Sequence, residues 1–249
     1  MRTIVRSTGA ATGVRPGKPG PYTPVVNVRV RLFAALRERV GSGAVELDLP
    51  EDSRVGDVWS ALDLGDEPPG ILFAVNRAYA DRAATLSAGD EVALIPPVSG
   101  GAQGNASGSE PQSRVRLVEG PLSLEAAVDE VRGNGAGAIA TFLGTVRNRS
   151  RGRDVLHLEY EAYEGMAEEV MTELAARLQE RHGLSAVSIH HRVGRVEIGE
   201  ASVVIAVSAP HRAEALAACK EAIDELKVSV PLWKKEVYEG GEEWIGQGS

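Results

Sequence analysis

A stretch without any large apolar side chain, Gly100–Ser113, interrupts this chain of 249 residues. It reads GGAQGNASGSEPQS, and a segment of this composition cannot contribute to a hydrophobic core. At about 150 residues per domain, the length is compatible with one or two domains. We therefore predict two domains, residues 25–101 and 114–249, joined by a linker over residues 102–113. Residues 1–24, which hold four basic side chains and no acidic ones, predict a flexible tail.

The charge and composition of the chain exclude several classes of protein. Its 27 basic and 35 acidic residues leave a net charge of −8, which argues against general binding to nucleic acid, so any anion site must be local. No segment has the length of an apolar membrane span, and the first residues lack the apolar region of a signal peptide. A single cysteine fits a reducing compartment. We expect a cytoplasmic protein that binds neither nucleic acid nor membranes.

The periodicity of apolar residues predicts an α+β fold for both domains. Alternation with polar residues indicates strands, and recurrence after three and four residues indicates helices. In the first domain we expect strands over 26–32, 45–49, 71–76 and 91–95, and helices over 34–40 and 53–62. In the second domain we expect strands over 138–146, 155–163, 187–193 and 202–208, and helices over 124–131, over 166–182 and between Pro210 and Pro231.

Two apolar faces in the second domain are specific enough to test. Leu156, Leu158 and Tyr160 are expected on one face of a strand, opposite a wet face. The last helix is expected to turn inward Leu216, Cys219, Ile223 and Leu226. The cysteine is therefore interpreted as a packed core thiol without a chemical role.

Two glycines close the first domain, directly after a predicted strand and a short Pro-containing segment. Without Cβ atoms, Gly100 and Gly101 would form a thin tail able to enter a narrow tunnel. A terminal glycine carboxylate would also be unhindered towards acyl activation. Glycine-rich segments routinely join domains, so position alone favours the start of a linker.

Four arginines lie within seven residues of the second domain, whose net charge is −6 (16 − 22). They are Arg147, Arg149, Arg151 and Arg153, and Asn, Ser and Gly residues separate or flank them. One interpretation is a solvated surface turn held by salt bridges. The other is a loop that captures a phosphate or carboxylate through forked donors.

His211 and Arg212 follow Pro210 at the start of the last predicted helix. Free backbone N–H groups at a helix start favour an anion, so a cation there is mildly unfavourable unless an anion lies beside it. The pair could hold such an anion. The competing interpretation is a histidine bound to a backbone carbonyl and an arginine paired with Glu214.

Two lysines flank the end of the same helix. Lys227 lies in its last turn, and Lys234 lies just past Pro231. Each lysine alone would be interpreted as a solvated charge that complements the helix dipole. A turn at Pro231 can fold Lys234 back towards Lys227, and two close, partly desolvated ammonium groups lower each other's pKa towards values useful for acid–base or nucleophilic chemistry.

Six separated segments of the second domain occur in a recognisable order. They are GA at 137–138 with FLGTVRN at 142–148, LEYEAY at 158–163 with GMA at 165–167, HRVG at 191–194, SAPHR at 208–212, LK at 226–227, and VPLWKKE at 230–236 with Trp244 after it. In this order they resemble the large, catalytic subunit of molybdopterin synthase. The first domain, ending in a strand and VSGG, is similar to ubiquitin-like sulfur carriers and specifically to the small subunit of that enzyme. The chain thus resembles a fusion of both subunits over about residues 25–101 and 114–245.

The resemblance implies a ubiquitin-like β-grasp domain followed by an α/β hammerhead-like catalytic domain. It also implies a sulfurtransferase that makes the dithiolene of molybdopterin in two transfers, from a Gly-Gly thiocarboxylate to cyclic pyranopterin monophosphate. Roles are implied for Gly101 with Gly100 as sulfur carrier, for Lys227 as acid–base or transient acyl acceptor, and for Lys234, Arg147, His211 and Arg212 in holding or assisting the substrate. We expect no cofactor, and the five histidines show no metal-ligand spacing.

The resemblance also implies partners. The chain has no GxxxxGK[ST] phosphate loop, so a separate ATP-dependent enzyme is expected to adenylate and sulfurate Gly101. Because large subunits of the family pair, self-association through the second domain is expected, as a dimer or, after cleavage, a heterotetramer.

The chain departs from the family pattern at one bond. Gly101 is followed by Ala102, whereas the second glycine is the C-terminus of separate small subunits, and an amide cannot be adenylated as a carboxylate can. Cleavage between these residues is therefore expected, in a linker exposed enough for proteolysis. An alternative is an uncleaved fusion whose first domain is only a docking module, with sulfur from a separate carrier. Donation of sulfur to another pathway, such as thiamine or tRNA thiolation, is a further alternative, but it would leave the second domain without a purpose. A structural fusion with an inactive site is disfavoured because every matching motif retains its charged residues.

Overall fold

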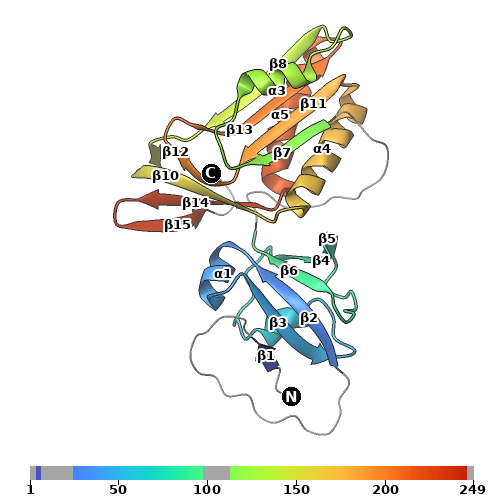
Figure 1. The fold of residues 1–249 in the computed structure, drawn as a ribbon, viewed down its shortest axis with the longest axis vertical. Helices are drawn as coiled ribbons and strands as arrows, with labels where there is room; N and C mark the ends of the chain where they lie inside the picture. The colour runs from blue at the N-terminus through green and yellow to red at the C-terminus, as the bar shows by residue number, and fades with distance from the viewer. Residues whose placement is uncertain (1–3, 7–24, 98–112, 246–249) are drawn as a thin grey trace. The chain divides into compact units, whose positions relative to one another are not determined.

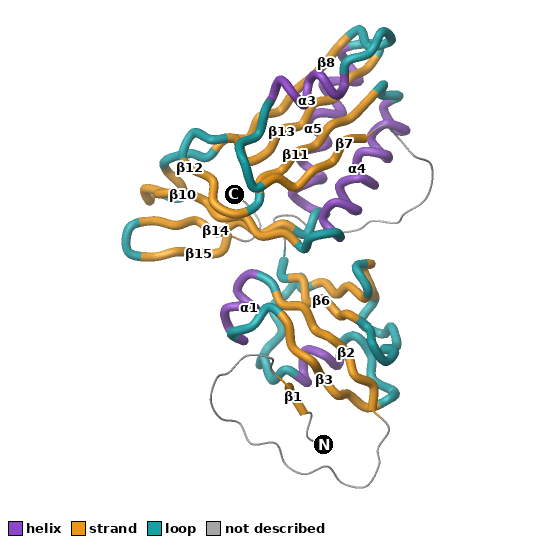
Figure 2. Tube along the Cα trace, viewed as in Figure 1, coloured by secondary structure: helices purple, strands orange, loops and turns teal. Residues whose placement is uncertain are grey.

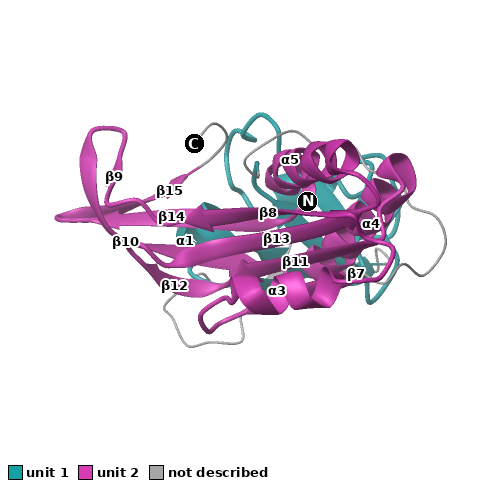
Figure 3. Ribbon diagram, turned by 90° about the horizontal axis from the view of Figure 1, so that it is seen from above, with its two compact units in different colours: residues 1–97 teal, residues 98–249 magenta. Residues whose placement is uncertain are grey.

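The computed structural model describes residues 4–6, 25–97 and 113–245. The chain divides into two compact units, residues 1–97 and 98–249 (Figure 3). Gly100, Gly101 and residues 102–112 of the predicted linker lie outside the described residues, whereas Ser113, its last predicted residue, begins a strand. The predicted α+β class is confirmed in both units.

The first unit is a six-stranded sheet with the order β1-β3-β2-β6-β4-β5. Its elements are β1 (Ile4–Arg6), β2 (Val25–Leu32), α1 (Ala34–Val40), β3 (Ala44–Pro50), α2 (Asp57–Ala61), β4 (Leu72–Val75), β5 (Ala78–Ala80) and β6 (Glu91–Ile95). The central strands β2 and β6 run parallel, while β2 pairs with β3 antiparallel. A hairpin, a helix and a parallel return strand make this unit a β-grasp domain.

Alternation along β2 explains the core of the first unit. Val28 and Val30 are fully buried on one side of the strand, whereas Arg29 between them is exposed. Val58 and Trp59 of α2 pack on the same core, and the Trp59 indole donates a hydrogen bond of 2.8 Å to the carbonyl of Gly65. The strand pattern seen in the sequence therefore defines the sheet face that the helix covers.

A short strand lies inside the segment that the sequence predicts to be a flexible tail. The backbone of β1 pairs antiparallel with β3, with Ile4 opposite Asp48 and Arg6 opposite Glu46. An edge strand has unpaired N–H and C=O groups, and any extended segment of suitable propensity can pair with them. The edge of β3 therefore offers a pairing site for residues 4–6, and the composition of the segment alone does not predict this strand.

The second unit contains a four-stranded sheet with the order β7-β11-β13-β8, covered on both faces. Its strands are β7 (Ser113–Val118), β8 (Ala138–Thr145), β11 (Ala186–Arg192) and β13 (Ala201–Ala209), and its helices are α3 (Leu124–Val131), α4 (Met166–His182) and α5 (Arg212–Ser229). The helices α4 and α5 cover one face and α3 the other (Figure 1). The nearly all-apolar strand β13 lies inside the sheet, as its sequence predicts.

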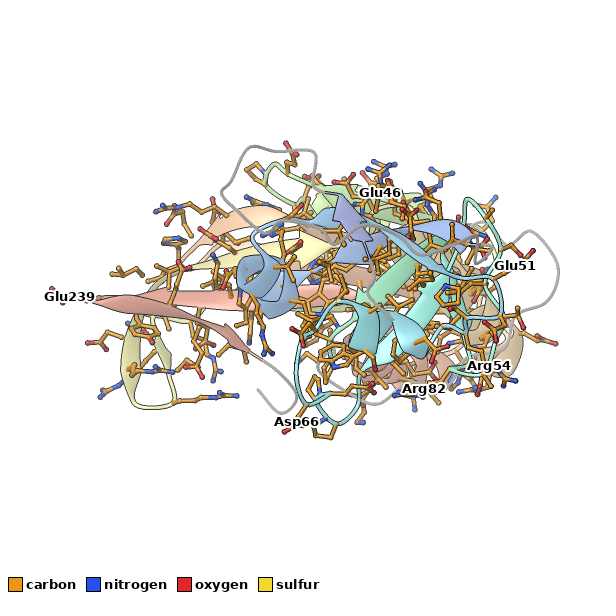
Figure 4. All side chains as sticks on the ribbon, turned by 90° about the horizontal axis from the view of Figure 1, so that it is seen from below. Glu46, Glu51, Arg54, Asp66, Arg82 and Glu239 are labelled. Carbon is orange, nitrogen blue, oxygen red and sulfur yellow. The ribbon has the colours of Figure 1, made fainter. Side chains whose placement is uncertain are left out.

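A second sheet of this unit has the order β12-β10-β14-β15 (Figure 2). The short strand β9 pairs with β10. Its strands are β9 (Arg149–Ser150), β10 (Arg153–Ala162), β12 (Gly194–Glu197), β14 (Leu232–Tyr238) and β15 (Gly241–Ile245). Glu239 lies exposed in the turn that joins β14 to β15 (Figure 4). The strand β14 begins three residues after the end of α5, so a tight turn carries the chain from the helix into this sheet.

Two expected apolar faces differ from the structure. Leu156 is 51% exposed and His157 is buried, because a register shift between Val155 and His157 in the pairing with β14 reverses the alternation there. Leu216 is 63% exposed, because the buried stripe of α5 runs through its neighbour Ala215 and continues at intervals of three and four residues. Within the described ranges, no helix is both long and apolar enough to cross a membrane.

Candidate active site

A cavity of about 380 Å³ lies within the second unit, lined by both of its sheets and by α5. Its apolar lining consists of Phe142, Leu143, Val155, Leu158, Val203, Ile223, Leu226, Val230 and Leu232, and its charged lining consists of Arg147, Arg149, Lys227, Lys234 and Glu236. Four cations thus face one carboxylate in a domain that is acidic overall. An apolar cavity with cationic residues suits a ligand that has an apolar part and an anionic group.

The structure brings together three of the residues expected to act on the substrate. Lys227 lies in the last turn of α5, and the buried Pro231 turns the chain so that Lys234 returns to the cavity from β14. Arg147 follows the buried Val146 at the end of β8. The two lysines and Arg147 line the same cavity although they come from three different elements.

Strand register decides which lysine of the pair 234–235 faces the cavity. Lys234 lies opposite Tyr160 of β10, and both line the cavity. The neighbouring Lys235 points to the other face of the sheet, where its Nζ lies 3.1 Å from Glu159 and 3.2 Å from Glu242. The period of two along β14 therefore places Glu236 on the same side as Lys234.

Burial lowers the pKa of Lys234, whose side chain is 20% exposed. The Glu236 carboxylate, with Oε1 3.7 Å from the Lys234 Nζ, opposes this shift. The positive charges of Lys227, Arg151 and Arg147 lower the pKa further. The charge of Lys227 therefore lowers the pKa of Lys234, as expected, but desolvation contributes more to this lowering.

A short hairpin, β9 with the start of β10, forms one side of the cavity. Ser150 of this hairpin lines the cavity, and its Oγ donates a hydrogen bond of 2.9 Å to Oε1 of Glu236. At the base of the hairpin, Arg153 pairs with Glu243 and lies 4.3 Å from the ring centroid of Tyr238. These contacts attach the hairpin to β14 and β15.

The four arginines of the basic segment do not share one role. Arg147 and Arg149 line the cavity, and Arg151 lies near enough to influence Lys234. Arg149 lies 3.9 Å from Asp154, and both side chains are strongly exposed. Arg153 forms a salt bridge with Glu243 of β15. The salt bridges of Arg149 and Arg153 agree with the first interpretation, while capture of an anion by Arg147 and Arg149 in the cavity stays a prediction.

A neutral aromatic wall closes another side of the cavity. His191 is buried, and its Nδ1–H donates a hydrogen bond of 2.8 Å to the carbonyl of Arg192. Desolvation lowers the pKa of His191 to about 4 and raises the pKa of Tyr160. Both side chains are uncharged at neutral pH, so the charges of the cavity come from its lysines, arginines and Glu236.

The structure does not bring every expected residue to this cavity. His211 and Arg212 are exposed at the opposite end of α5 from Lys227. Fifteen residues of helix separate Arg212 from Lys227, which corresponds to about 22 Å. Within one chain, the two basic groups therefore cannot serve the same small ligand.

Neither a metal-binding cluster nor an activated thiol is found among the residues that the structure describes. Within the part of the chain that the structure describes, no group of three or more His, Cys, Asp or Glu side chains is placed to hold a metal ion. Cys219 is buried, and burial raises the pKa of its thiol to about 11. It is therefore a thiol and not a thiolate at neutral pH.

Two cavity residues, Glu236 and Ser150, received no role from the sequence. The alternation of WKKEVY does place Glu236 on the same strand face as Lys234. The alternation along this segment therefore already indicated that Glu236 lies on the same face as Lys234. Ser150 contacts Glu236 across 86 positions of the chain, and no local pattern reveals such a contact.

Comparison with known proteins matches each unit to one family. The family model described as "MoaE protein" matches residues 117–229, and the family model "ThiS family" matches residues 30–101. The molybdopterin synthase catalytic subunit of Halalkalibacterium halodurans is 46% identical over 133 residues, which cover 53% of this chain and 85% of that protein. The corresponding protein of Bacillus subtilis is 45% identical over 133 residues, with the same two coverages of 53% and 85%. The chain belongs to the molybdopterin synthase catalytic subunit family.

A solved structure supports the same assignment for the second unit. The crystal structure of molybdopterin synthase from Staphylococcus aureus is 37% identical and has a TM-score of 0.51, covering 55% of this chain and 99% of that one. The match to the MoaE model begins within β7, and the match to the ThiS model precedes it in the same chain. The expected fusion of the two kinds of domain is confirmed, and the chain is an enzyme of molybdenum cofactor biosynthesis.

Proposed function

We propose that the second unit transfers sulfur to cyclic pyranopterin monophosphate from a thiocarboxylate carried on Gly101 of the first domain. The observation that supports this most strongly is the convergence of Lys227, Lys234 and Arg147 on one apolar cavity. The apolar walls suit the pterin ring, and the cations suit its phosphate and the anionic thiocarboxylate.

Each transfer forms a carbon–sulfur bond on the substrate in place of a carbon–oxygen bond, whose oxygen leaves as water or stays on the phosphate. The acyl–sulfur bond of the carrier then breaks. The thiocarboxylate sulfur attacks the substrate, and Lys227 moves protons at this step or accepts the acyl group transiently through its amine. Water then supplies the oxygen that restores the glycine carboxylate. Two transfers complete the dithiolene, so each product molecule consumes two thiocarboxylates.

Lys234 and Arg147 are assigned to holding the pterin and its phosphate. The lowered pKa of Lys234 also suits a proton transfer, so this lysine can assist Lys227. We assign His211 and Arg212 to the cavity of a second copy of the chain, because the cavity of the same chain lies at the other end of α5. This assignment requires self-association through the second unit.

Sulfur transfer requires a free carboxylate on Gly101, so we propose cleavage of the bond to Ala102. An ATP-dependent partner then adenylates and sulfurates the exposed carboxylate. Gly100 and Gly101 together provide the narrow tail that enters the cavity.

Cells that lack both molybdopterin synthase subunits test this function. The full chain is expected to restore molybdopterin, whereas Lys227→Ala and deletion of Gly100 and Gly101 are expected to abolish it. Ala102→Pro, which resists proteolysis at this bond, is expected to reduce it strongly. A glycine-deleted chain that still makes molybdopterin in these cells would contradict the proposal, and one that works only with a separate small subunit would identify the first domain as a docking module.

A further inference from the structure

The Glu236 carboxylate lies between the hairpin and the cavity lysine. Its side chain is 5% exposed, and one of its oxygens, Oε1, has two neighbours. Ser150 donates a hydrogen bond to this oxygen at 2.9 Å, while the Nζ of Lys234 lies 3.7 Å from it. The serine therefore has the closer contact, and the lysine has the longer one.

A hydroxyl donor and an ammonium group lie against the same carboxylate oxygen. A carboxylate held by a neutral donor satisfies part of its hydrogen-bonding capacity without adding charge. If the donor is absent, the nearby ammonium can move closer to the same oxygen, and a closer ion pair raises the pKa of the lysine. A closed pair would also turn the Lys234 ammonium from the cavity towards the strand.

We propose that Ser150 is a positioning residue that keeps Glu236 from closing on Lys234. It acts through Glu236 and need not touch the substrate. The proposal rests on the function proposed above in one respect, namely that Lys234 serves the reaction. The serine sets how much of the Lys234 charge is available to a ligand in the cavity.

Other charged and titratable groups also face Lys234. Lys227 faces it from α5, Arg147 from the end of β8, Arg151 from the hairpin and Tyr160 from the opposite strand β10. The cations lower the pKa of Lys234 whether Ser150 is present or absent. A change on removing Ser150 alone therefore reports on the contact with Glu236.

The pKa of Lys234 can be measured in the full chain without an activity assay. The chain has five lysines, Lys18, Lys220, Lys227, Lys234 and Lys235, so carbon-13 labelling of lysine gives few signals, and Lys234→Arg identifies the signal of interest. We expect Ser150→Ala to raise the pKa of Lys234 by about half a unit, and Ser150→Thr, which keeps the hydroxyl, to leave it near the value of the unmodified chain. The matched control is Ser185→Ala, because Ser185 is an exposed serine just before β11.

The Glu236→Gln background separates positioning from simple support of the hairpin. Ser150→Ala is expected to leave the pKa of Lys234 unchanged in that background, because the competing charge is gone. With Glu236 present, Ser150→Ala is expected to lower kcat/KM about fivefold, mainly by raising KM, and Ser150→Thr is expected to restore it.

The outcomes distinguish the two proposals. An unchanged pKa of Lys234 in Ser150→Ala, with thermal unfolding as in the Ser185→Ala control, would overturn the positioning role. A lower melting temperature without a shifted pKa would show that Ser150 only supports the hairpin, which also overturns it. A shifted pKa with unchanged kinetics would keep the positioning role and contradict instead the part assigned to Lys234 in the reaction.

Discussion

The rings of Tyr160 and His191 meet edge to face, with centroids 4.9 Å apart and planes inclined at 74°. This contact joins β10 of one sheet to β11 of the other at the wall of the cavity. Such pairs add stability beyond the area they bury. A charged imidazole would be poorly accommodated here, which makes the contact sensitive to acid.

Stability should fall as pH decreases from about 6.5 to 4 because of His191. The folded state lowers the pKa of this residue from 6.5 to about 4, so in this window the unfolded chain binds a proton that the folded chain does not. Stability from this source is fully present above pH 6.5 and is lost as pH falls, by at most about 3 kcal/mol. Urea unfolding of the chain and of His191→Phe at pH 7 and pH 5 measures the difference; equal pH dependence in both would contradict the prediction.

Substitution of Arg147 should weaken substrate binding more than it slows the chemical step. Its guanidinium lines the cavity, and a lost charge-assisted contact to a phosphate is expected to raise KM roughly tenfold. Steady-state kinetics of Arg147→Ala provide the test, with Arg195→Ala as control because Arg195 pairs with Glu197 on exposed β12. An unchanged KM would remove Arg147 from the binding site.

Two inactive chains should restore activity when they are mixed. If Arg212 serves the cavity of a second copy, a pair of Lys227→Ala and Arg212→Ala chains contains one intact site. Random pairing of the two variants is expected to give about a quarter of the natural activity. Activity assays of chains expressed together, compared with each variant alone, measure this, and absence of any recovery would place Arg212 outside the partner's site.

Gly137→Ala should destabilise the second unit although alanine is a small residue. A Cβ at this position would overlap the backbone carbonyl oxygen of Pro210, and backbone cannot move aside as a flexible side chain can. We expect a loss of about 2 kcal/mol or more in the free energy of unfolding. Gly135→Ala is the control, since a Cβ there meets no atom within 4 Å. Equal urea midpoints for the two variants would contradict the prediction.

Much of the fold could be predicted because apolar residues recur at regular intervals along its core strands and long helices. The alternation of Val28 and Val30 in β2, and the apolar run of β13, indicated buried strands that the structure contains. The short strands β12 and β15 could not be predicted, since GRVE and GEEWI have little alternation of their own. They form because β10 and β14 offer edges with which to pair.

The site was predictable where residues belong to a recognisable motif. The turn at Pro231 indicated that Lys234 returns towards Lys227, and the structure places both in one cavity. The tether from Ser150 to Glu236 depends on strand pairing across the chain, which no local pattern specifies. The separation of Arg212 from this cavity follows from the length of α5, which the sequence already indicates between Pro210 and Pro231.

The intact mass of the protein from its native host shows whether Gly101 becomes the sulfur carrier. We expect two fragments, one ending at Gly101 and partly carrying a sulfur-for-oxygen increment, and one beginning at Ala102. An uncut chain in cells that actively make molybdopterin would exclude Gly101 as the carrier of the sulfur.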